Sequence, residues 1–167
     1  MIYTQNYLSP LGKIILTSDG ENLTGLYFEG QKYFPENLGE EKISPIFEKT
    51  FDWLNIYFSG ENPKFFPKIK MSATNFRKIV WKVLLQIPYG ETKTYGEIAK
   101  KINSSAQAVG GAVGHNPISI IIPCHRVVGS GGNLTGYAGG IEKKNKLLEL
   151  EKIDTKNFFI PASGTAL

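Results

Sequence analysis

Apolar residues alternate with polar ones along the first thirty residues and recur at helical spacing from residue 44 onward. Turn-forming sequences flank two apolar runs, 13–17 and 23–28, and this pattern predicts short strands. Ser44 then fits the N-cap of a helix, because proline follows it and apolar residues recur every three or four positions as far as Phe58. We therefore expect a small N-terminal domain of mixed α/β type with antiparallel strands, residues 1–60.

The next segment changes character. Two prolines between residues 61 and 73 disfavour a helix, so we expect an extended linker there. A helix with one apolar face should begin near Thr74, and its Trp81 is expected to pack in the core or between the domains. The fold class is therefore α+β, with a mainly helical second domain at 74–167.

Two short helices are predicted in the middle of the second domain. Thr94 and Glu97 form a capping box, and Ser104 and Gln107 form a second one that opens a helix at 108–114. Such a pair is typical of a winged-helix-like helix-turn-helix, although short helix pairs are common and many bind nothing. Three glycines in the second helix cost it about 1 kcal/mol each, which suits a smooth face that a groove or another backbone can approach.

Charge is distributed unevenly along the chain. Residues 1–70 hold 7 Lys/Arg against 9 Asp/Glu, a net of −2, whereas residues 71–167 hold 12 against 6, a net of +6. A basic C-terminal half suggests a polyanionic partner, although lysine-rich faces are common and can serve solubility alone. The single cysteine excludes an internal disulfide, and with two histidines no zinc site of the usual kind can form. Without an N-terminal signal or a membrane-spanning apolar run, we expect a cytoplasmic protein that contacts no membrane.

The apolar run 121–128 contains that cysteine, Cys124, and is expected to be strand-like. His125 and Arg126 follow directly, and a neighbouring base or cation is what turns a thiol into a nucleophilic thiolate. A buried structural cysteine would also suit the run, but it would not explain the Cys-His-Arg order. We therefore favour a reactive thiol.

A glycine-rich loop at 129–140 follows the cysteine, with Tyr137 near its end. It lacks the lysine pattern of a phosphate-binding loop and is long enough to suggest either a functional role or mobility. A helix is expected at 141–152, and Glu151 near its end could orient His125 as a third member of a relay. From the sequence alone, however, Glu151 is more typical of a solvated surface residue.

Residues 74–152 closely resemble the O(6)-alkylguanine-DNA alkyltransferases. The Pro-Cys-His-Arg-Val core is highly specific, and it stands between a helix-turn-helix and a Gly-Tyr loop, as in that family. The matching positions are Phe76, Val80, Trp81, Ile87, Pro88, Gly90, Tyr95, Ala108 to Gly110, Asn116, Pro117, Ile122 to Val127, Gly136, Tyr137, Gly139, Gly140, Leu147, Leu148 and Glu151. The first seventy residues match only in plan.

The resemblance implies a DNA-repair reaction in which an alkyl group passes irreversibly, once per molecule, from O(6)-alkylguanine to Cys124. The resemblance leaves open whether O(4)-alkylthymine is a second substrate. By the same resemblance His125 deprotonates the thiol through a water, Glu151 orients His125, Tyr95 protonates the leaving base, and Asn116 holds the turn before the active-site segment. The family implies a monomer with no cofactor and no metal.

The resemblance also implies binding to the minor groove of double-stranded DNA, with the alkylated base flipped into a pocket. The positions carried over for DNA contact are Tyr95, Gln107, Ala108, Gly110, Gly111, Gly114 and Arg126. Those for the base pocket are Val127, Tyr137 and Ala138. Two positions depart from the family: Gln107 replaces an arginine that fills the gap left by the base, and Ala138 replaces a serine common at that place.

Three other functions fit part of the sequence. A cysteine hydrolase would use the same Cys-His-Glu set but leaves the helix-turn-helix unexplained. A non-catalytic sensor of alkylated DNA would need no cysteine, and Cys124 argues against it. A transcription regulator using the helix-turn-helix would leave the cysteine motif without a role.

Overall fold

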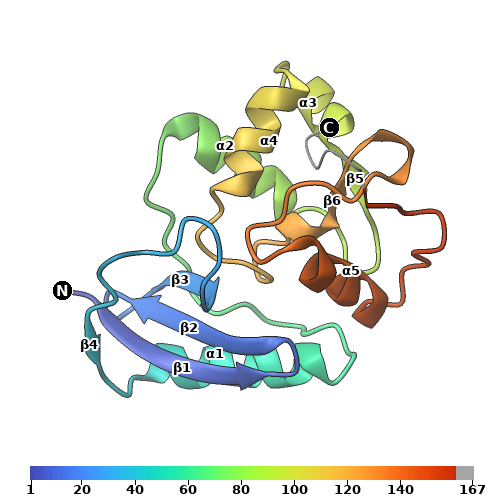
Figure 1. Ribbon diagram of the computed structural model, residues 1–167. Helices are drawn as coiled ribbons and strands as arrows, with labels where there is room; N and C mark the ends of the chain where they lie inside the picture. The colour runs from blue at the N-terminus through green and yellow to red at the C-terminus, as the bar shows by residue number, and fades with distance from the viewer. Residues whose placement is uncertain (161–167) are drawn as a thin grey trace. The chain divides into compact units, whose positions relative to one another are not determined.

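The computed structural model describes residues 1–160, and the chain divides into two compact units (Figure 1). The first comprises residues 1–72 and 117–119, and the second comprises 73–116 together with the chain from 120 onward. The α+β class predicted from the sequence is confirmed, with antiparallel strands in the first unit and mainly helices in the second. No helix within residues 1–160 is long and apolar enough to span a bilayer.

A four-stranded sheet forms the frame of the first unit, in the order β3-β2-β1-β4. Its strands are β1 (Tyr3–Ser9), β2 (Gly12–Ser18), β3 (Leu23–Phe28) and β4 (Glu40–Glu41). The first three pair antiparallel, and β4 lies parallel to β1. The hairpin between β1 and β2 is tight because Gly12 adopts a φ of 116°, which side-chain-bearing residues rarely reach.

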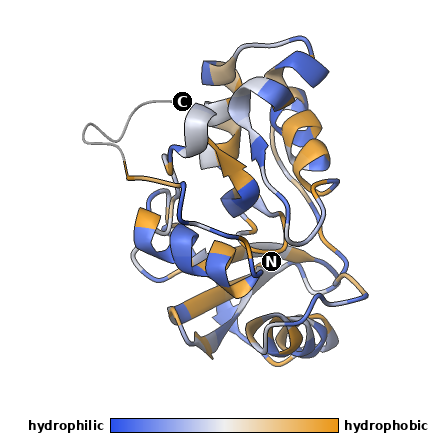
Figure 2. Cartoon of the chain, turned by 90° about the vertical axis from the view of Figure 1, so that its right-hand side faces the viewer, coloured by the Kyte–Doolittle hydropathy of each residue, from blue (hydrophilic) through white to orange (hydrophobic). Residues whose placement is uncertain are grey.

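Helix α1 (Pro45–Phe58) covers this sheet. It begins after Ser44 with proline at its first position, as predicted. Its buried residues include Phe47, Leu54 and Tyr57, and the helix contacts β1, β2 and β3. Hydrophobic and hydrophilic residues alternate around the helix and along the strands, which is how one face of each element comes to be buried (Figure 2).

Two segments from elsewhere in the chain extend the first unit. We expected a linker at 61–73, but residues 61–72 belong to the first unit, and Leu23 of β3 forms a parallel bridge with Ile69. Leu26 of β3 forms a parallel bridge with the middle residue of the segment 117–119. Backbone from beyond the helix-turn-helix therefore completes the N-terminal unit.

The described part of the second unit contains four α-helices, two 3₁₀ turns and two short strands. Its elements are α2 (Asn75–Leu84), β5 (Lys93–Thr94), α3 (Tyr95–Lys101), α4 (Ala106–Gly114), η1 (Cys124–Arg126), β6 (Val127–Val128), η2 (Ser130–Gly132) and α5 (Ile141–Leu150). Trp81 is buried as predicted, and its indole donates to the carbonyl of Ala112 at 2.8 Å, which ties α2 to α4. Thr94 caps α3 by accepting from the amide of Glu97.

The start of α4 differs from the prediction. Its N-cap is Ser105, whose hydroxyl accepts from the amide of Ala108, and the helix begins at residue 106. Ser104 instead closes the preceding helix, because its amide donates to the carbonyl of Ala99 at 2.8 Å. Gln107 is therefore not the capping-box partner of Ser104 and lies in the first turn of α4.

Candidate active site

Cys124 begins a 3₁₀ turn, although the apolar run 121–128 predicted a strand up to the thiol. The chain enters the turn after Ile120, whose φ of 70° is costly for a β-branched residue. The last two residues of the run form β6, which pairs parallel to β5. This abrupt bend buries the thiol, so that 5% of Cys124 is exposed.

Asn116 braces the bend and reaches the thiol. Its amide donates to the carbonyl of Ile122 at 2.8 Å. Burial raises the pKa of Cys124, while the hydrogen bond from Asn116 and the positive charge of Lys144 act to lower it. The cysteine is therefore a neutral thiol in the DNA-free protein, with a donor and a cation in place to stabilise the thiolate once it forms.

Glu151 lies at the centre of a buried polar cluster. One carboxylate oxygen is 2.5 Å from His125 Nε2 and 3.2 Å from Arg126 Nη2. The other accepts from Arg126 Nε at 2.8 Å and from the amide of Gly90 at 3.0 Å. Arg126 also donates from Nη1 to the carbonyl of Ile87 at 2.8 Å. The expectation that Glu151 is a solvated surface residue is therefore wrong, because α5 ends with its carboxylate turned inward and fully paired.

The cluster fixes the charge and the tautomer of His125. Burial alone would raise the pKa of Glu151, but its contacts with His125 and Arg126 lower it to about 2, so the carboxylate is ionised. Burial lowers the pKa of His125, which keeps the imidazole neutral. A carboxylate can only accept, so His125 donates its Nε2–H to Glu151 and carries its lone pair on Nδ1. Nδ1 is thus the nitrogen that can take a proton.

Lys144 is a fully buried lysine that the sequence analysis did not single out. Its ammonium donates to the carbonyl of Thr135 at 2.8 Å, and the hydroxyl of Tyr95 donates to the same carbonyl at 3.1 Å. Burial lowers the pKa of Lys144 to about 8, an effect that the charge of Cys124 opposes. Burial and the charge of Cys124 raise the pKa of Tyr95, so its hydroxyl keeps its proton.

A signal for Lys144 was present in the sequence. Leu147 and Leu148, three and four residues further on, are buried on the same face of α5, so the helical period places Lys144 inside. We did not predict that Lys144 is buried, because lysine is almost never fully buried unless its charge is paired.

Arg126 does not occupy the place expected for a DNA contact. Its side chain is 10% exposed, and the guanidinium is engaged by Glu151 and by the carbonyl of Ile87. It also lies over the ring of Tyr89, at 5.7 Å from the centroid. Its donors hold the buried carboxylate in position, so the structure gives Arg126 an internal role.

The residues expected in the base pocket lie in the same unit as Cys124. Val127 and Tyr137 are buried, and Ala138 is partly exposed. Tyr137 follows shortly after Thr135, whose carbonyl holds Tyr95. A Cβ built on the intervening Gly136 would lie 3.5 Å from the Tyr95 hydroxyl, so this loop runs directly past that side chain.

The face of α4 is smooth and partly open. Gln107, Ala108 and Gly111 are exposed, and Gly110 and Gly114 are partly exposed. An open depression of about 390 Å³ lies beside this face. It is lined by Thr74, Phe76, Arg77, Gln107, Ala108, Gly111, Ala112 and His115. Arg77 and His115 are candidate ligand-contacting residues that the sequence did not reveal. They come from the ends of two different helices, α2 and α4, which only the fold brings together.

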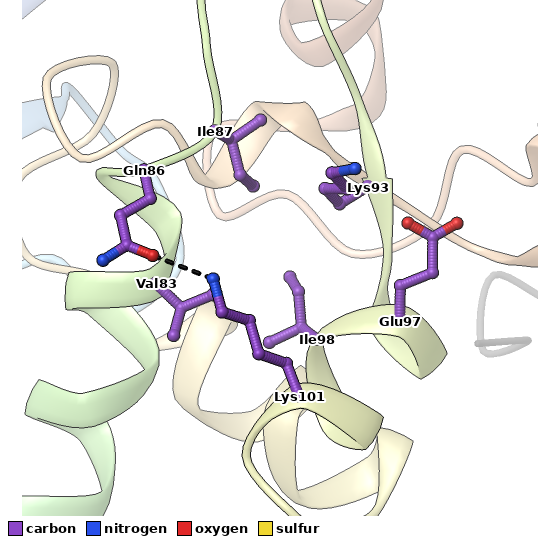
Figure 3. Close-up of a pocket in the computed structure, with 7 residues that line it drawn as sticks. All are labelled: Val83, Gln86, Ile87, Lys93, Glu97, Ile98 and Lys101. Atoms are coloured by element: carbon purple, nitrogen blue, oxygen red, sulfur yellow. Dashed lines mark hydrogen bonds between the residues drawn. The ribbon is translucent and has the colours of Figure 1, made fainter.

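A second pocket, of about 220 Å³, lies beside α2, β5 and α3 (Figure 3). Its lining residues are Val83, Gln86, Ile87, Lys93, Glu97, Ile98 and Lys101. Figure 3 shows the ammonium of Lys101 turned toward Gln86, to whose side-chain oxygen it donates at 2.9 Å. The pocket borders the buried cluster through Ile87, whose carbonyl accepts from Arg126.

Two family models match the chain and together span most of it. The model described as 6-O-methylguanine DNA methyltransferase, ribonuclease-like domain, matches residues 2–71, and the model described as 6-O-methylguanine DNA methyltransferase, DNA binding domain, matches residues 75–153. The chain belongs to this family, the O(6)-alkylguanine-DNA alkyltransferases, as the resemblance in the sequence indicated.

Curated relatives agree with this assignment. A methylated-DNA–protein-cysteine methyltransferase from Mycobacterium bovis is 48% identical over 91% of this chain and 93% of its own length. One of the same name from Haemophilus influenzae is 45% identical over 91% of this chain and 87% of its own length.

Solved structures are similar over the same extent. The crystal structure of Mycobacterium tuberculosis OGT in complex with DNA has a TM-score of 0.82 and 46% identity, covering 90% of this chain and 92% of that one. The O6-methylguanine-DNA methyltransferase of Pyrococcus kodakaraensis has a TM-score of 0.67 and 28% identity, covering 92% of this chain and all of that one, 100%.

Proposed function

We propose that Cys124 accepts the alkyl group of O(6)-alkylguanine in double-stranded DNA, in one irreversible transfer per protein molecule. Membership of the methyltransferase family carries the reaction class, DNA repair by alkyl transfer from DNA to a protein cysteine. The single observation that carries the assignment to this residue is the buried Cys124 beside a His-Glu pair of defined tautomer.

The chemistry follows from the charges of the site. His125 Nδ1 takes the thiol proton through a water, and the resulting thiolate attacks the alkyl carbon. The bond between that carbon and the guanine oxygen breaks, and its electron pair leaves with the base. Lys144 and Asn116 stabilise the thiolate electrostatically. The product is a thioether that water does not readily hydrolyse, so the protein is consumed.

Tyr95 is the candidate acid for the leaving base. Its raised pKa means that it holds its proton until a developing anion on guanine draws it, and the Thr135 carbonyl orients the hydroxyl. The nearby ammonium of Lys144, 5.8 Å from the ring centroid, stabilises the phenolate that the transfer leaves behind.

Burial of Cys124 supports a base-flipping route. A thiol with 5% exposure cannot reach an atom inside a base stack, so the alkylated base must leave the duplex and enter the protein. The exposed Gln107 and the glycines of α4 suit a close approach to the minor groove, where Gln107 would fill the space left by the base. A monomer suffices, because one unit contains all of these residues.

The other functions are less well supported. A cysteine hydrolase would use the same Cys124, His125 and Glu151, but it would leave the helix pair α3 and α4 without a role. A lesion sensor would have no use for the His125–Glu151 pair. A regulator that uses only α3 and α4 would not require Cys124 to be buried beside Lys144 and Asn116.

The test is the intact mass of the protein after incubation with a duplex that contains one O(6)-methylguanine. We expect the mass to rise by one methyl group per molecule, with peptide mapping placing it on Cys124 and no second turnover. Cys124→Ala should bind the duplex and gain no mass. An unchanged parent mass with retained binding would support the sensor, and methylation of Cys124→Ala would overturn the assignment of Cys124.

A further inference from the structure

The glycine-rich segment after the cysteine is held by the end of the described chain. We call residues 129–138 the pocket loop and residues 155–160 the C-terminal strap. Leu134 donates its amide to the carbonyl of Phe159 at 2.8 Å, and Phe159 donates its own amide to the carbonyl of Gly132 at 3.0 Å. These bonds form a parallel bridge between Asn133 and Phe159, so the two segments lie side by side (Figure 1).

The strap approaches the pocket loop closely enough to require a glycine. A Cβ on Gly132 would lie 2.7 Å from the carbonyl oxygen of Asn157 and 3.0 Å from the ring of Phe158. Its neighbour Gly131 has a similar conformation, with φ of 72° against 88°, yet a Cβ there would meet nothing within 4 Å. The close approach is thus specific to one of two adjacent glycines that are otherwise alike.

The strap is itself anchored to the interior. Phe158 is partly buried against a cluster formed by Val128, Leu134 and Leu148. These residues come from β6, from the pocket loop and from α5. A displacement of the strap would therefore expose apolar surface and remove two backbone hydrogen bonds of the pocket loop.

The residues of the pocket loop that pair with the strap lie next to residues of the proposed substrate site. Leu134, which pairs with the strap, precedes Thr135, whose carbonyl accepts from Tyr95 and Lys144. Gly136 and Tyr137 follow, beside the Tyr95 hydroxyl and in the expected pocket wall. The backbone position of residue 134 thus sets where the Thr135 carbonyl and the Tyr137 ring lie.

We propose that the C-terminal strap is a specificity-determining element, which fixes the pocket loop and thereby limits the size of the alkyl group that the site accepts. The inference rests on the proposed function. With the strap in place the wall is rigid and close, which favours a methyl group. When the strap is released the loop relaxes, so that methyl transfer loses its alignment while a bulkier group gains room.

The experiment compares Gly132→Ala with Gly131→Ala. Both place a side chain at a positive φ, so both carry similar backbone strain, but only the first forces the strap away. Single-turnover rates are measured on duplexes containing O(6)-methylguanine or O(6)-benzylguanine. The benzyl-to-methyl ratio of rates does not depend on the fraction of active protein, so partial unfolding alone leaves it unchanged.

We expect the ratio to rise by about threefold or more in Gly132→Ala and to stay at the parent value in Gly131→Ala. An equal ratio in Gly132→Ala and the parent, or an equal rise in both variants, would overturn the proposal. A parent protein that transfers neither group would instead overturn the proposed function.

A second variant covers the case in which Gly132→Ala does not fold. Phe159→Pro removes the amide that donates to Gly132 and leaves the residues of the pocket loop unchanged. It should raise the same ratio and speed hydrogen exchange at the Leu134 amide. Faster exchange with an unchanged ratio would show that the strap holds the loop without governing specificity, which contradicts the proposal.

Discussion

A lysine ammonium loses its hydration when it is buried, and Lys144 is fully buried. Its pKa falls to about 8 in the folded protein from an ordinary value of 10.5. Because the folded pKa is the lower one, the unfolded chain binds the proton more tightly, and at neutral pH this residue destabilises the fold by about 3 kcal/mol. That cost has a use if the ammonium stabilises the Cys124 thiolate.

We therefore expect Lys144→Met to raise the free energy of unfolding at pH 7 by up to about 3 kcal/mol while slowing alkyl transfer. The gain in stability should shrink between pH 8 and pH 10.5. In that range the folded parent holds Lys144 neutral, and the free energy needed to remove the proton from the unfolded chain falls as the pH rises. Urea unfolding at several pH values measures it, with the exposed Lys146→Met as control. A variant as active as the parent would show that Lys144 does not assist the thiolate.

Glu151 has the opposite effect on stability. Its folded pKa of about 2 is below the ordinary value of 4.5, so its contribution is complete above pH 4.5 and is lost as the pH falls toward 2. The size of that contribution is about 3 kcal/mol. Burial lowers the pKa of His125 as well. Below its ordinary value of 6.5 the unfolded chain therefore binds a proton that the folded protein does not, which lowers the free energy of unfolding further in acid.

Glu151→Gln should be less stable than the parent at pH 7 by about 3–5 kcal/mol, because Arg126 loses its buried partner. The difference should narrow as the pH falls from 4.5 to 2, and alkyl transfer should need a higher pH. Chemical unfolding and transfer rates across this range measure both effects, with the exposed Glu149→Gln as control. Parallel stability curves for variant and parent would mean that Glu151 titrates normally.

At the scale of secondary-structure elements, α4 combines a smooth face with an uncharged residue in its first turn. Gln107 is exposed there and is not needed as a cap, since Ser105 caps the helix. Its amide can fill the gap left by a flipped base but lacks the planar charge of arginine. A residue that stabilises the extruded state matters only when a base must be flipped.

Gln107→Arg should accordingly speed transfer from O(6)-methylguanine in duplex DNA more than transfer from the free base O(6)-benzylguanine, where nothing is flipped. Second-order rate constants on each substrate measure the effect, and Ala106→Arg provides a control one residue away. We expect a gain of up to about tenfold on duplex, equivalent to 1.4 kcal/mol of the few that unstacking costs. Equal gains on both substrates would point to general charge.

Elements with a local signal were predictable from the sequence. In α1, α2 and α3 an N-cap residue is followed directly by apolar residues at helical spacing, and turn residues bound β1 to β3. The segment around Cys124 was mispredicted because its shape depends on a backbone conformation and a side-chain contact that hydrophobicity does not encode. The positive φ of Ile120 and the amide of Asn116 bend a chain that by composition should be a strand.

The site was predictable in its members but only in part in its arrangement. Cys124 and His125 are adjacent in the sequence, which made them candidates at once. Lys144 lies in α5 and Glu151 is the C-cap of that helix, and their burial follows from how the helix packs. Charge alone assigns both residues to solvent. For Glu151 that assignment is overturned by His125 and Arg126, which are distant in the sequence, whereas for Lys144 the helical period of α5 was the overlooked local signal.

At the scale of the whole molecule, the boundary between the two units is also set by long-range pairing. Backbone at 117–119 completes the first unit, although the sequence around it belongs to the second. The division of charge, in contrast, could be taken from the sequence directly. The basic excess lies in the half of the chain that contains the helix-turn-helix, apart from Lys144 and Arg126, which are buried.

Binding to undamaged duplex should therefore weaken steeply with salt, because lysines and arginines of the second unit displace counterions from phosphates. Each phosphate contact adds about 0.9 to the slope of log association constant against log salt concentration.

Arg77, beside the face of α4, is expected to make one such contact, so Arg77→Gln should lower the slope by about 1. Lys64→Gln, an exposed residue of the first unit, should leave the slope unchanged. Fluorescence anisotropy over a range of salt concentrations measures the slopes. A flat response in the parent would place the basic excess away from the DNA, and equal slopes for Arg77→Gln and Lys64→Gln would remove Arg77 from the interface.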